Sequence, residues 1–163
     1  MPSVFLGLGS NLGDKTGNIQ KALTLIAERV GEIISSSKYY ETSPWGYISS
    51  ETYINAAIRV DTNLMPEELL VITQEIEQTV GRKEKTVGRE YHDRIIDIDI
   101  LLYDDLVLSS EMLTIPHPHL PLREFVLLPL SEIAPDIVHP VLSKTVSELL
   151  CLINPEQTTY GNK

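Results

Sequence analysis

At the centre of the sequence stands the stretch Arg94-Ile95-Ile96-Asp97-Ile98-Asp99-Ile100-Leu101-Leu102-Tyr103. It predicts a β-strand, because β-branched and large apolar residues dominate it and it contains no Gly or Pro. Successive side chains of a strand point to opposite faces of the sheet, so one face is wholly apolar and the other carries two aspartates. The apolar face comprises Ile96, Ile98, Ile100 and Leu102, and the other comprises Ile95, Asp97, Asp99, Leu101 and Tyr103.

The two carboxylates of Asp97 and Asp99 stand side by side on this strand, with their Cβ atoms about 6.5–7 Å apart. An unpaired charge on a core-like strand costs several kcal/mol, so a positive group has to meet both aspartates. That group is either a pair of Lys or Arg side chains or a metal ion such as Mg²⁺, and the D-x-D pattern alone leaves both open.

Length and composition indicate one domain. The chain has 163 residues, enough to bury a sizeable core, and we expect residues 1–163 to form a single domain with a frayed tail at 154–163. The sequence holds no apolar run of about 20 residues and no signal-peptide pattern at its start. Cys151 is the single cysteine, which excludes an intramolecular disulfide and suits a cytoplasmic location.

The net charge of −10 argues against nucleic-acid binding, which requires a basic face. Residues 82–94 are locally basic, however, with Arg82, Lys83, Lys85, Arg89 and Arg94 against three acidic residues. A basic segment just before two aspartates suggests a small polyanion bound beside a metal. A solvated loop with its own ion pairs remains the alternative.

The order of predicted elements is β-α-β-β-α-β, which is typical of a ferredoxin-like α+β sandwich with an antiparallel sheet. Both helices are expected to cover the apolar face of the sheet and to leave the aspartate face open. Gly7, Gly9 and Gly13 are expected to permit a tight strand-to-helix turn, with Asn11 or Asp14 capping the helix. The strands are expected at 4–9, 32–42, 53–63 and 94–103, and the helices at 15–30 and 66–81.

A helical extension follows this core. A turn at 104–105 and a possible short return strand at 106–108 precede a proline-stiffened connection at 113–121, and helices are expected at 122–130 and 141–153. His117 and His119 form a lone H-x-H pattern, for which hydrogen-bonding roles are favoured over metal binding. The loop at 43–51 carries Trp45, which either packs under the loop or forms the wall of a flat ligand's site.

Seven motifs in this order and spacing resemble the 6-hydroxymethyl-7,8-dihydropterin pyrophosphokinase family over nearly the whole chain. They are Gly9-Ser10-Asn11-Leu12-Gly13, Thr42-Ser43-Pro44 with Gly46, Tyr53-Ile54-Asn55-Ala56-Ala57, Glu77 with Gly81-Arg82, Arg94 to Leu101, Thr114-Ile115-Pro116-His117-Pro118, and Arg123-Glu124-Phe125-Val126-Leu127.

The resemblance implies an enzyme that transfers diphosphate from ATP to the hydroxymethyl group of the reduced pterin and releases AMP. It implies that Asp97 and Asp99 hold two Mg²⁺ ions on the ATP phosphates, and that Arg82 and Arg94 bind phosphate oxygens. The other implied nucleotide contacts are Gln74, Glu77, Ile100, Thr114, His117 and Arg123. The implied pterin site comprises Thr42, Ser43, Pro44, Trp45, Tyr53, Asn55 and Phe125.

The loop before the aspartate strand departs from the family pattern. Many members have Arg-Trp-Gly-Pro-Arg where this chain has the six residues from Arg89 to Arg94. Which of Lys83, Lys85, Arg89 and Tyr91 contacts ATP stays open, and no residue stands out as a general base. We expect a monomer that acts on small molecules and binds neither nucleic acid nor membrane.

Two other functions compete with this interpretation. Another two-metal phosphotransfer enzyme on a ferredoxin-like core would show further Asp, Glu or His ligands at other strand ends, and the sequence offers no convincing set. A non-catalytic ligand-binding domain of the same fold would not need aspartates and arginines on one face.

Overall fold

The computed structural model describes residues 1–42, 52–81 and 95–154. Between residues 103 and 124 the chain contains a small two-stranded sheet and a short 3₁₀ helix at Leu120–Leu122. The strands are β1 (Ser3–Ser10), β2 (Gly31–Ser36), β3 (Tyr40–Thr42), β4 (Tyr53–Thr62), β5 (Asp97–Tyr103), β6 (Leu108–Ser109) and β7 (Thr114–Ile115). The α-helices are α1 (Lys15–Arg29), α2 (Pro66–Gly81), α3 (Glu124–Ile133) and α4 (Val146–Ile153).

Within the described residues, the main sheet has the strand order β2-β4-β1-β5, and β3 also pairs with β4. Every pairing in it is antiparallel. Helix α1 connects β1 to β2, and β4 lies between these two strands, which is the split β-α-β arrangement of a ferredoxin-like fold. The predicted fold class is therefore confirmed.

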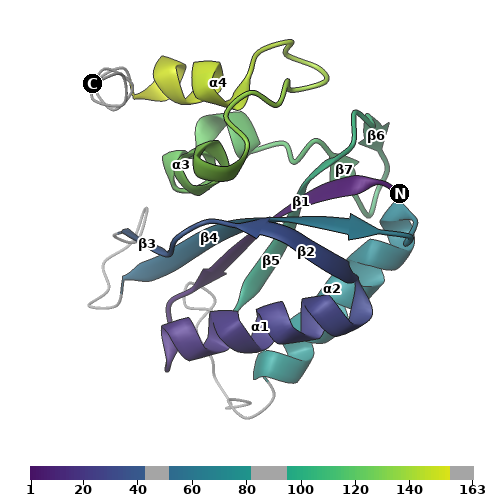
Figure 1. The fold of residues 1–163 in the computed structure, drawn as a ribbon, viewed down its shortest axis with the longest axis vertical. Coiled ribbons are helices and arrows are strands. Elements are labelled where there is room, and N and C mark those ends of the chain that lie inside the picture. Colours follow the sequence, from purple (N-terminus) through teal and green to yellow (C-terminus); the bar gives the residue numbers. More distant parts are fainter. Residues whose placement is uncertain (43–51, 82–94, 155–163) are drawn as a thin grey trace.

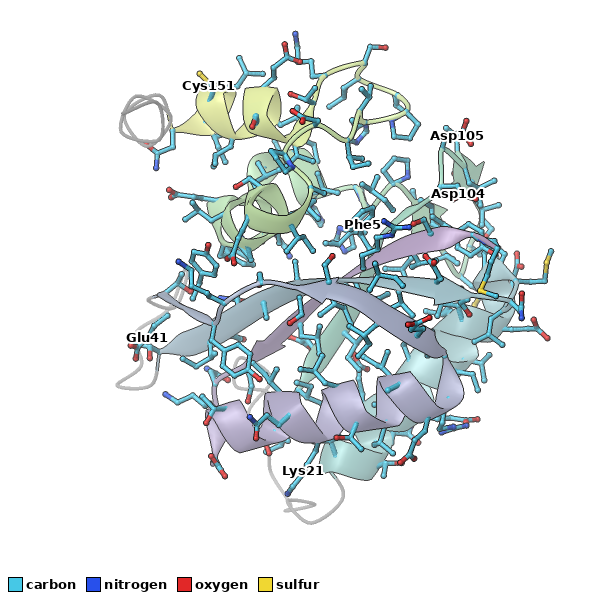
Figure 2. All side chains as sticks on the ribbon, in the orientation of Figure 1. Phe5, Lys21, Glu41, Asp104, Asp105 and Cys151 are labelled. Atoms are coloured by element: carbon cyan, nitrogen blue, oxygen red, sulfur yellow. The ribbon has the colours of Figure 1, made fainter. Side chains whose placement is uncertain are left out.

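Helices cover both faces of the sheet: α1 and α2 lie on one face, and α3 and α4 on the other (Figure 1). The first face is packed on a core that includes Leu6 of β1, Ile26 of α1 and Ile76 of α2. The second core joins the sheet to the C-terminal helices, and Figure 2 shows Phe5 of β1 pointing into it. The expectation that the aspartate face is left open is therefore wrong in part, because the C-terminal helices cover some of that face.

Strand β5 contains a bulge that changes the predicted distribution of its side chains. Phe5 of β1 pairs with Leu102 and the next residue, Leu6, pairs with Ile100, so Leu101 is an extra residue in β5. Ile100 packs under α1 and α2 as predicted, whereas Leu101 and Leu102 both pack against the C-terminal helices. The prediction that Leu102 shares the face of Ile100 is wrong for this reason.

The same bulge returns Tyr103 to the α1–α2 core, whereas the alternation predicted it on the aspartate face. Its hydroxyl donates a hydrogen bond to the carbonyl of Leu64, just before α2, at 2.6 Å. Strand β5 is also shorter than predicted, because its regular pairing begins at Asp97.

Other predicted boundaries differ as well, and the helix expected at 122–130 is α3, Glu124–Ile133. The strand expected at 32–42 is divided into β2 and β3 around Ser37, whose N–H donates to the carbonyl of Ala57 and whose hydroxyl accepts from the Ala57 N–H, both at 2.9 Å. The last helix begins at Val146 rather than Val141, because Thr145 and Glu148 form a capping box there. The expected cap of α1 is confirmed at Asp14, which accepts from the N–H of Gly17 at 3.2 Å.

Candidate active site

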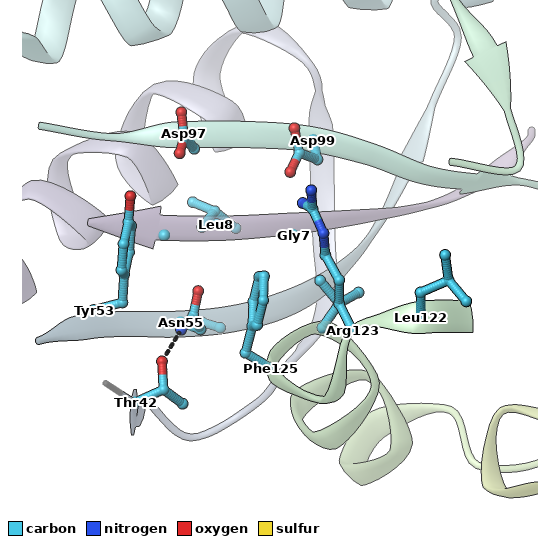
Figure 3. Close-up of a pocket in the computed structure, with 13 residues that line it drawn as sticks. Gly7, Leu8, Thr42, Tyr53, Asn55, Asp97, Asp99, Leu122, Arg123 and Phe125 are labelled. Carbon is cyan, nitrogen blue, oxygen red and sulfur yellow. Dashed lines mark hydrogen bonds between the residues drawn. The ribbon is translucent and has the colours of Figure 1, made fainter. Parts of the chain in front are cut away.

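A cavity of about 510 Å³ opens on the aspartate face of the sheet, beside the start of α3. Its floor comes from the neighbouring strands β4, β1 and β5, and one wall comes from the start of α3 (Figure 3). A cavity of this size is typical of a small-molecule site. It is lined by Gly7, Leu8, Gly9, Thr42, Tyr53, Asn55, Ala56, Asp97, Asp99, Leu122, Arg123, Phe125 and Val126.

The register of the strands explains how distant residues meet at this floor. Gly9 of β1 pairs with Asn55 of β4 on one side and with Asp97 of β5 on the other. Gly7, two residues earlier and on the same face, pairs with Asp99. The central strand therefore presents glycines between the polar side chains of its two neighbours, which leaves space above the strand.

The interpretation of Gly7 and Gly9 as residues of a strand-to-helix turn is wrong, because both lie inside β1. A Cβ atom at Gly9 would lie 2.9 Å from Oδ1 of Asn55, so even alanine would disturb that amide. Glycines at alternate positions inside a strand often mark the close approach of a ligand, and this signal was present in the sequence. The sequence reasoning also missed Leu8, Ala56, Leu122 and Val126 as lining residues.

The acidic end of the cavity is formed by Asp97 and Asp99, both half-buried on β5. The Arg123 guanidinium, which extends from the residue preceding α3, points toward Asp99 (Figure 3). No cluster of three His, Cys, Asp or Glu side chains suited to a metal occurs in the part of the chain that the structure describes.

A pair of carboxylates facing an open cavity nevertheless fits Mg²⁺. This hard ion prefers oxygen ligands, and in nucleotide sites it is usually bound by one or two carboxylates together with phosphate oxygens and water. Asp97 and Asp99 supply the protein part of such a ligand set, and the cavity leaves room for the remaining oxygens.

The other end of the cavity combines aromatic rings with a buried amide. Tyr53 of β4 and Phe125 of α3 stand on either side of Asn55 in Figure 3. Asn55 is 7% exposed, and its Nδ2 donates a hydrogen bond to Oγ1 of Thr42 at 3.0 Å. The guanidinium carbon of Arg123 lies 5.5 Å from the Phe125 ring centroid, within the range of a cation–π interaction. These groups suit a flat heterocycle with polar edges.

The remaining candidate nucleotide residues in the described ranges do not line the cavity. Gln74 is exposed on α2, Thr114 is exposed on β7, and the side chain of Ile100 is buried in the α1–α2 core on the opposite face of the sheet. Glu77 is half-buried on α2, and its Oε2 accepts a hydrogen bond from the backbone N–H of Ile98 at 2.7 Å. None of these four side chains therefore lines the cavity.

His117 lies beside β5, where its backbone N–H donates a hydrogen bond to the carbonyl of Leu101 at 3.0 Å. Its Nδ1 accepts from the backbone N–H of His119 at 3.1 Å, which agrees with the predicted hydrogen-bonding role. Burial of the ring, together with the nearby charges of Arg123 and His119, lowers the pKa of His117 to about 4. The imidazole is therefore neutral at pH 7.

Five residues predicted to belong to the site lie outside the described residues. They are Arg82 and Arg94, expected at the phosphates, and Ser43, Pro44 and Trp45, expected at the pterin.

In a comparison with protein-family models, residues 5–135 match the model described as 7,8-dihydro-6-hydroxymethylpterin-pyrophosphokinase (HPPK). The matched range begins in β1 and extends just beyond α3, and it therefore includes every lining residue of the cavity.

Curated relatives agree with this match. A 2-amino-4-hydroxy-6-hydroxymethyldihydropteridine pyrophosphokinase of Porphyromonas gingivalis is 45% identical over 141 residues, which are 86% of this chain and 95% of the relative. A protein of the same name from Aquifex aeolicus is 40% identical over 158 residues, 97% of this chain and 94% of the relative. The folic acid synthesis protein fol1 of Schizosaccharomyces pombe is 42% identical over 147 residues, 90% of this chain but 20% of that longer protein.

Solved structures support the fold. The Plasmodium falciparum HPPK-DHPS structure with SDX-DHP superposes with a TM-score of 0.75 at 20% identity, over all of this chain and 45% of that chain. This chain thus spans about half the length of the solved chains that it matches. With the matched family model and two relatives at 40% identity or more along nearly their whole length, the chain belongs to the 7,8-dihydro-6-hydroxymethylpterin-pyrophosphokinase family.

Proposed function

We propose that this pyrophosphokinase transfers the terminal diphosphate of ATP to the hydroxymethyl oxygen of 6-hydroxymethyl-7,8-dihydropterin, in a reaction that requires Mg²⁺. The new bond joins the pterin oxygen to the β-phosphorus, the bond between the β-phosphorus and the α,β-bridging oxygen breaks, and AMP leaves with that oxygen. The hydroxyl proton is released to solvent or to a base that we do not assign.

One observation supports this proposal above all others. A pair of carboxylates, a guanidinium and an aromatic–amide pocket share a single cavity, although they come from β5, α3, β4 and β3. A non-catalytic binding domain has no need of the acidic end, and a general phosphodiesterase has no need of the aromatic–amide end. Phosphoryl transfer depends mainly on positioning of the reactants and on charge neutralisation. The aromatic–amide pocket can position a substrate, and the carboxylates, through bound metal, and the guanidinium can neutralise phosphate charge.

At the acidic end, we propose that Asp97 and Asp99 hold two Mg²⁺ ions. The metal would supply charge neutralisation on the phosphates and so reduce their repulsion toward the incoming hydroxyl oxygen. Arg123 is placed to bind a phosphate oxygen as well, because a guanidinium stays charged and can donate two hydrogen bonds at once. We assign phosphate binding to Arg82 and Arg94 too.

We propose that the nucleotide extends from the acidic end toward His117, which lies beside β5. A neutral His117 can donate or accept a hydrogen bond there without repelling Arg123. The further nucleotide residues of this proposal are Gln74, Glu77, Ile100 and Thr114.

At the other end, we propose that the pterin stacks between Phe125 and Tyr53, with Asn55 and Thr42 reading its polar edge. A buried amide discriminates strongly between heterocycles, because a ligand with the wrong donors and acceptors leaves it unpaired. Ser43, Pro44 and Trp45 complete this proposed site. We further propose that the enzyme acts as a cytoplasmic monomer; within the described residues, no helix has the length and apolarity that a membrane span requires.

The test is a turnover assay with ATP, Mg²⁺ and 6-hydroxymethyl-7,8-dihydropterin, in which the nucleotides are separated by chromatography. We expect AMP and pterin diphosphate in equal amounts, no product when EDTA removes the metal, and none when 6-methyl-7,8-dihydropterin replaces the substrate. Formation of ADP, or no turnover with all three components present, would contradict the proposal.

A further inference from the structure

Glu132, in the last turn of α3, is bound to the backbone that leads into β3. Its Oε1 accepts a hydrogen bond from the hydroxyl of Tyr40 at 2.7 Å. The backbone N–H of Lys38 donates to both carboxylate oxygens, at 3.1 and 3.3 Å. One side chain of α3 therefore holds two points of the segment from Lys38 to Tyr40.

That segment leads directly to the amide end of the cavity. Tyr40 is the cross-strand neighbour of Asn55, and Thr42 is the cross-strand neighbour of Tyr53. Thr42 also accepts the hydrogen bond that orients the Asn55 amide. The position of β3 consequently decides where the Thr42 hydroxyl lies and how the Asn55 side chain points.

Strand β3 needs such support because its own pairing is small. It has three residues and pairs with β4 alone among the described strands. A short strand with one neighbour has little local stability of its own. Ser37 is hydrogen-bonded to Ala57, on the β2 side of this segment, and Glu132 is hydrogen-bonded to Lys38 and Tyr40, nearer to Thr42.

Helix α3 carries both the Glu132 carboxylate and residues that line the opposite wall of the cavity. Phe125 and Val126 in its first turns line the cavity, and Glu132 near its other end holds the segment before β3. The Glu132 carboxylate thus connects the wall that carries the Phe125 ring with the wall that carries Thr42 and Asn55. A change in this connection alters the spacing between the two walls.

The charge of the acceptor strengthens this contact, which lies at the exposed surface of α3. A charged acceptor forms stronger hydrogen bonds than a neutral one, and two donors share this carboxylate. Burial of the phenol, together with its hydrogen bond to Glu132 and the charge of Glu132, raises the pKa of Tyr40 to about 12. Tyr40 therefore remains a protonated donor at any pH at which the enzyme works.

We propose that Glu132 and Tyr40 are positioning residues for pterin recognition: the carboxylate on α3 fixes β3 so that Thr42 and Asn55 meet the polar edge of the heterocycle. Neither residue lines the cavity, and neither was singled out by sequence. The inference rests on the proposed function, because it assigns the pterin to that end of the cavity.

The test compares Glu132→Ala, Glu132→Gln and Tyr40→Phe by steady-state kinetics. We expect Glu132→Ala to raise KM for the pterin by about tenfold, the scale of one lost charge-assisted hydrogen bond, with KM for ATP and kcat changed less than about twofold. Tyr40→Phe is expected to give a smaller rise of the same kind. Glu132→Gln keeps an acceptor oxygen for Tyr40 and is expected to restore part of the affinity.

A double-mutant cycle adds a second criterion. If the two residues act through one contact, Glu132→Ala combined with Tyr40→Phe should raise the pterin KM no more than Glu132→Ala alone. Glu148→Ala is the matched control, because Glu148 also accepts a backbone N–H, that of Thr145 at 2.8 Å, but lies on α4 away from the cavity. It should leave both KM values unchanged.

Equal rises in both KM values, or no change in the pterin KM of Glu132→Ala, would overturn the inference. Calorimetric binding of the pterin, with Mg²⁺ and a non-hydrolysable ATP analogue present, separates this outcome from a failure of the proposed function. If the unmodified chain makes no AMP, the proposed function fails. Unchanged pterin binding in Glu132→Ala refutes the positioning role whether or not the enzyme turns over.

Discussion

Replacing Gly9 by alanine should separate substrate recognition from folding in this protein. The new Cβ would lie 2.9 Å from Oδ1 of Asn55 and 3.8 Å from Cδ1 of Tyr53. Carbon–oxygen contacts are comfortable at about 3.3–3.6 Å, so the Asn55 amide has to move by about 0.4 Å or more. The obstructing atom ends a side chain and is not backbone, so the sheet itself can remain in place.

The expected magnitudes follow from the hydrogen bonds involved. Moving the amide weakens its bond to Thr42, which costs about 1 kcal/mol, while alanine inside a strand gains about 0.5–1 kcal/mol over glycine. The free energy of unfolding should therefore change by less than about 1 kcal/mol. A substrate edge left without its amide partner costs about 1–3 kcal/mol, which corresponds to about 5- to 150-fold in pterin affinity.

Calorimetric titration with the pterin, in the presence of Mg²⁺ and a non-hydrolysable ATP analogue, measures the affinity, and urea denaturation measures stability. Gly7→Ala is the comparison, because its Cβ meets the Leu101 side chain at 3.3 Å and no atom of Asn55. It should lower pterin affinity less than Gly9→Ala does. An unchanged pterin affinity in Gly9→Ala would refute the placement of Asn55 at the pterin edge, as would an equal loss in Gly7→Ala.

Three further predictions concern other parts of the molecule. Asp97→Asn and Asp99→Asn should each lower turnover at least about a hundredfold with an unchanged thermal unfolding midpoint, and near-normal turnover in both would make these carboxylates structural. The lowered pKa of His117, about 4, means that the folded state favours the neutral ring; its contribution is present above pH 6.5 and is lost as the pH falls toward 4. Between pH 6.5 and pH 4, the free energy of unfolding measured in urea should fall by on the order of 1–2 kcal/mol more in the unmodified chain than in His117→Asn; this figure is already reduced for the partial exposure of the ring. The same pH dependence in both proteins would contradict this prediction. Ser143 has φ 60°, so Ser143→Gly should stabilise the chain by about 0.5 kcal/mol, because relief of about 1 kcal/mol of backbone strain exceeds the added entropy of the unfolded chain. Equal or lower stability in urea would count against this last prediction.

The aspartate pair and its neighbours were within reach of sequence reasoning. Alternation along a strand places Asp97 and Asp99 on one face without any structural information. The assignment of Asn55, Phe125 and Arg123 to the same site required the family resemblance, because they come from distant parts of the chain. The structure brings all five to one cavity.

The bulge in β5 could not be predicted, because it depends on the partner strand. Ile100, Leu101 and Leu102 are all large and apolar, so no hydrophobic pattern marks where the alternation changes. The extra residue becomes visible only when Phe5 and Leu6 of β1 are paired with β5. Both cores of the sheet are apolar, so the residue type of these leucines does not indicate which core each one joins.

Two other differences have different causes. The division of the predicted 32–42 strand arises from hydrogen bonds between Ser37 and Ala57, a tertiary contact with no local signal. The start of α4 was readable in the sequence, since Thr145 and Glu148 have the spacing of a capping box. The apolar residues before Thr145 were wrongly included in the helix.

Among the described strands, β5 lies at one edge of the main sheet, and such edges can recruit a strand from another molecule. Here side chains and a neighbouring loop already occupy part of it: Glu77 accepts the Ile98 N–H, and the His117 N–H donates to the Leu101 carbonyl. Glu77, which we propose to contact the nucleotide, therefore also occupies a backbone donor of this edge strand. Substitutions of Glu77 intended to probe ATP binding should therefore be checked for self-association, because an exposed edge would lower activity in a way that depends on protein concentration.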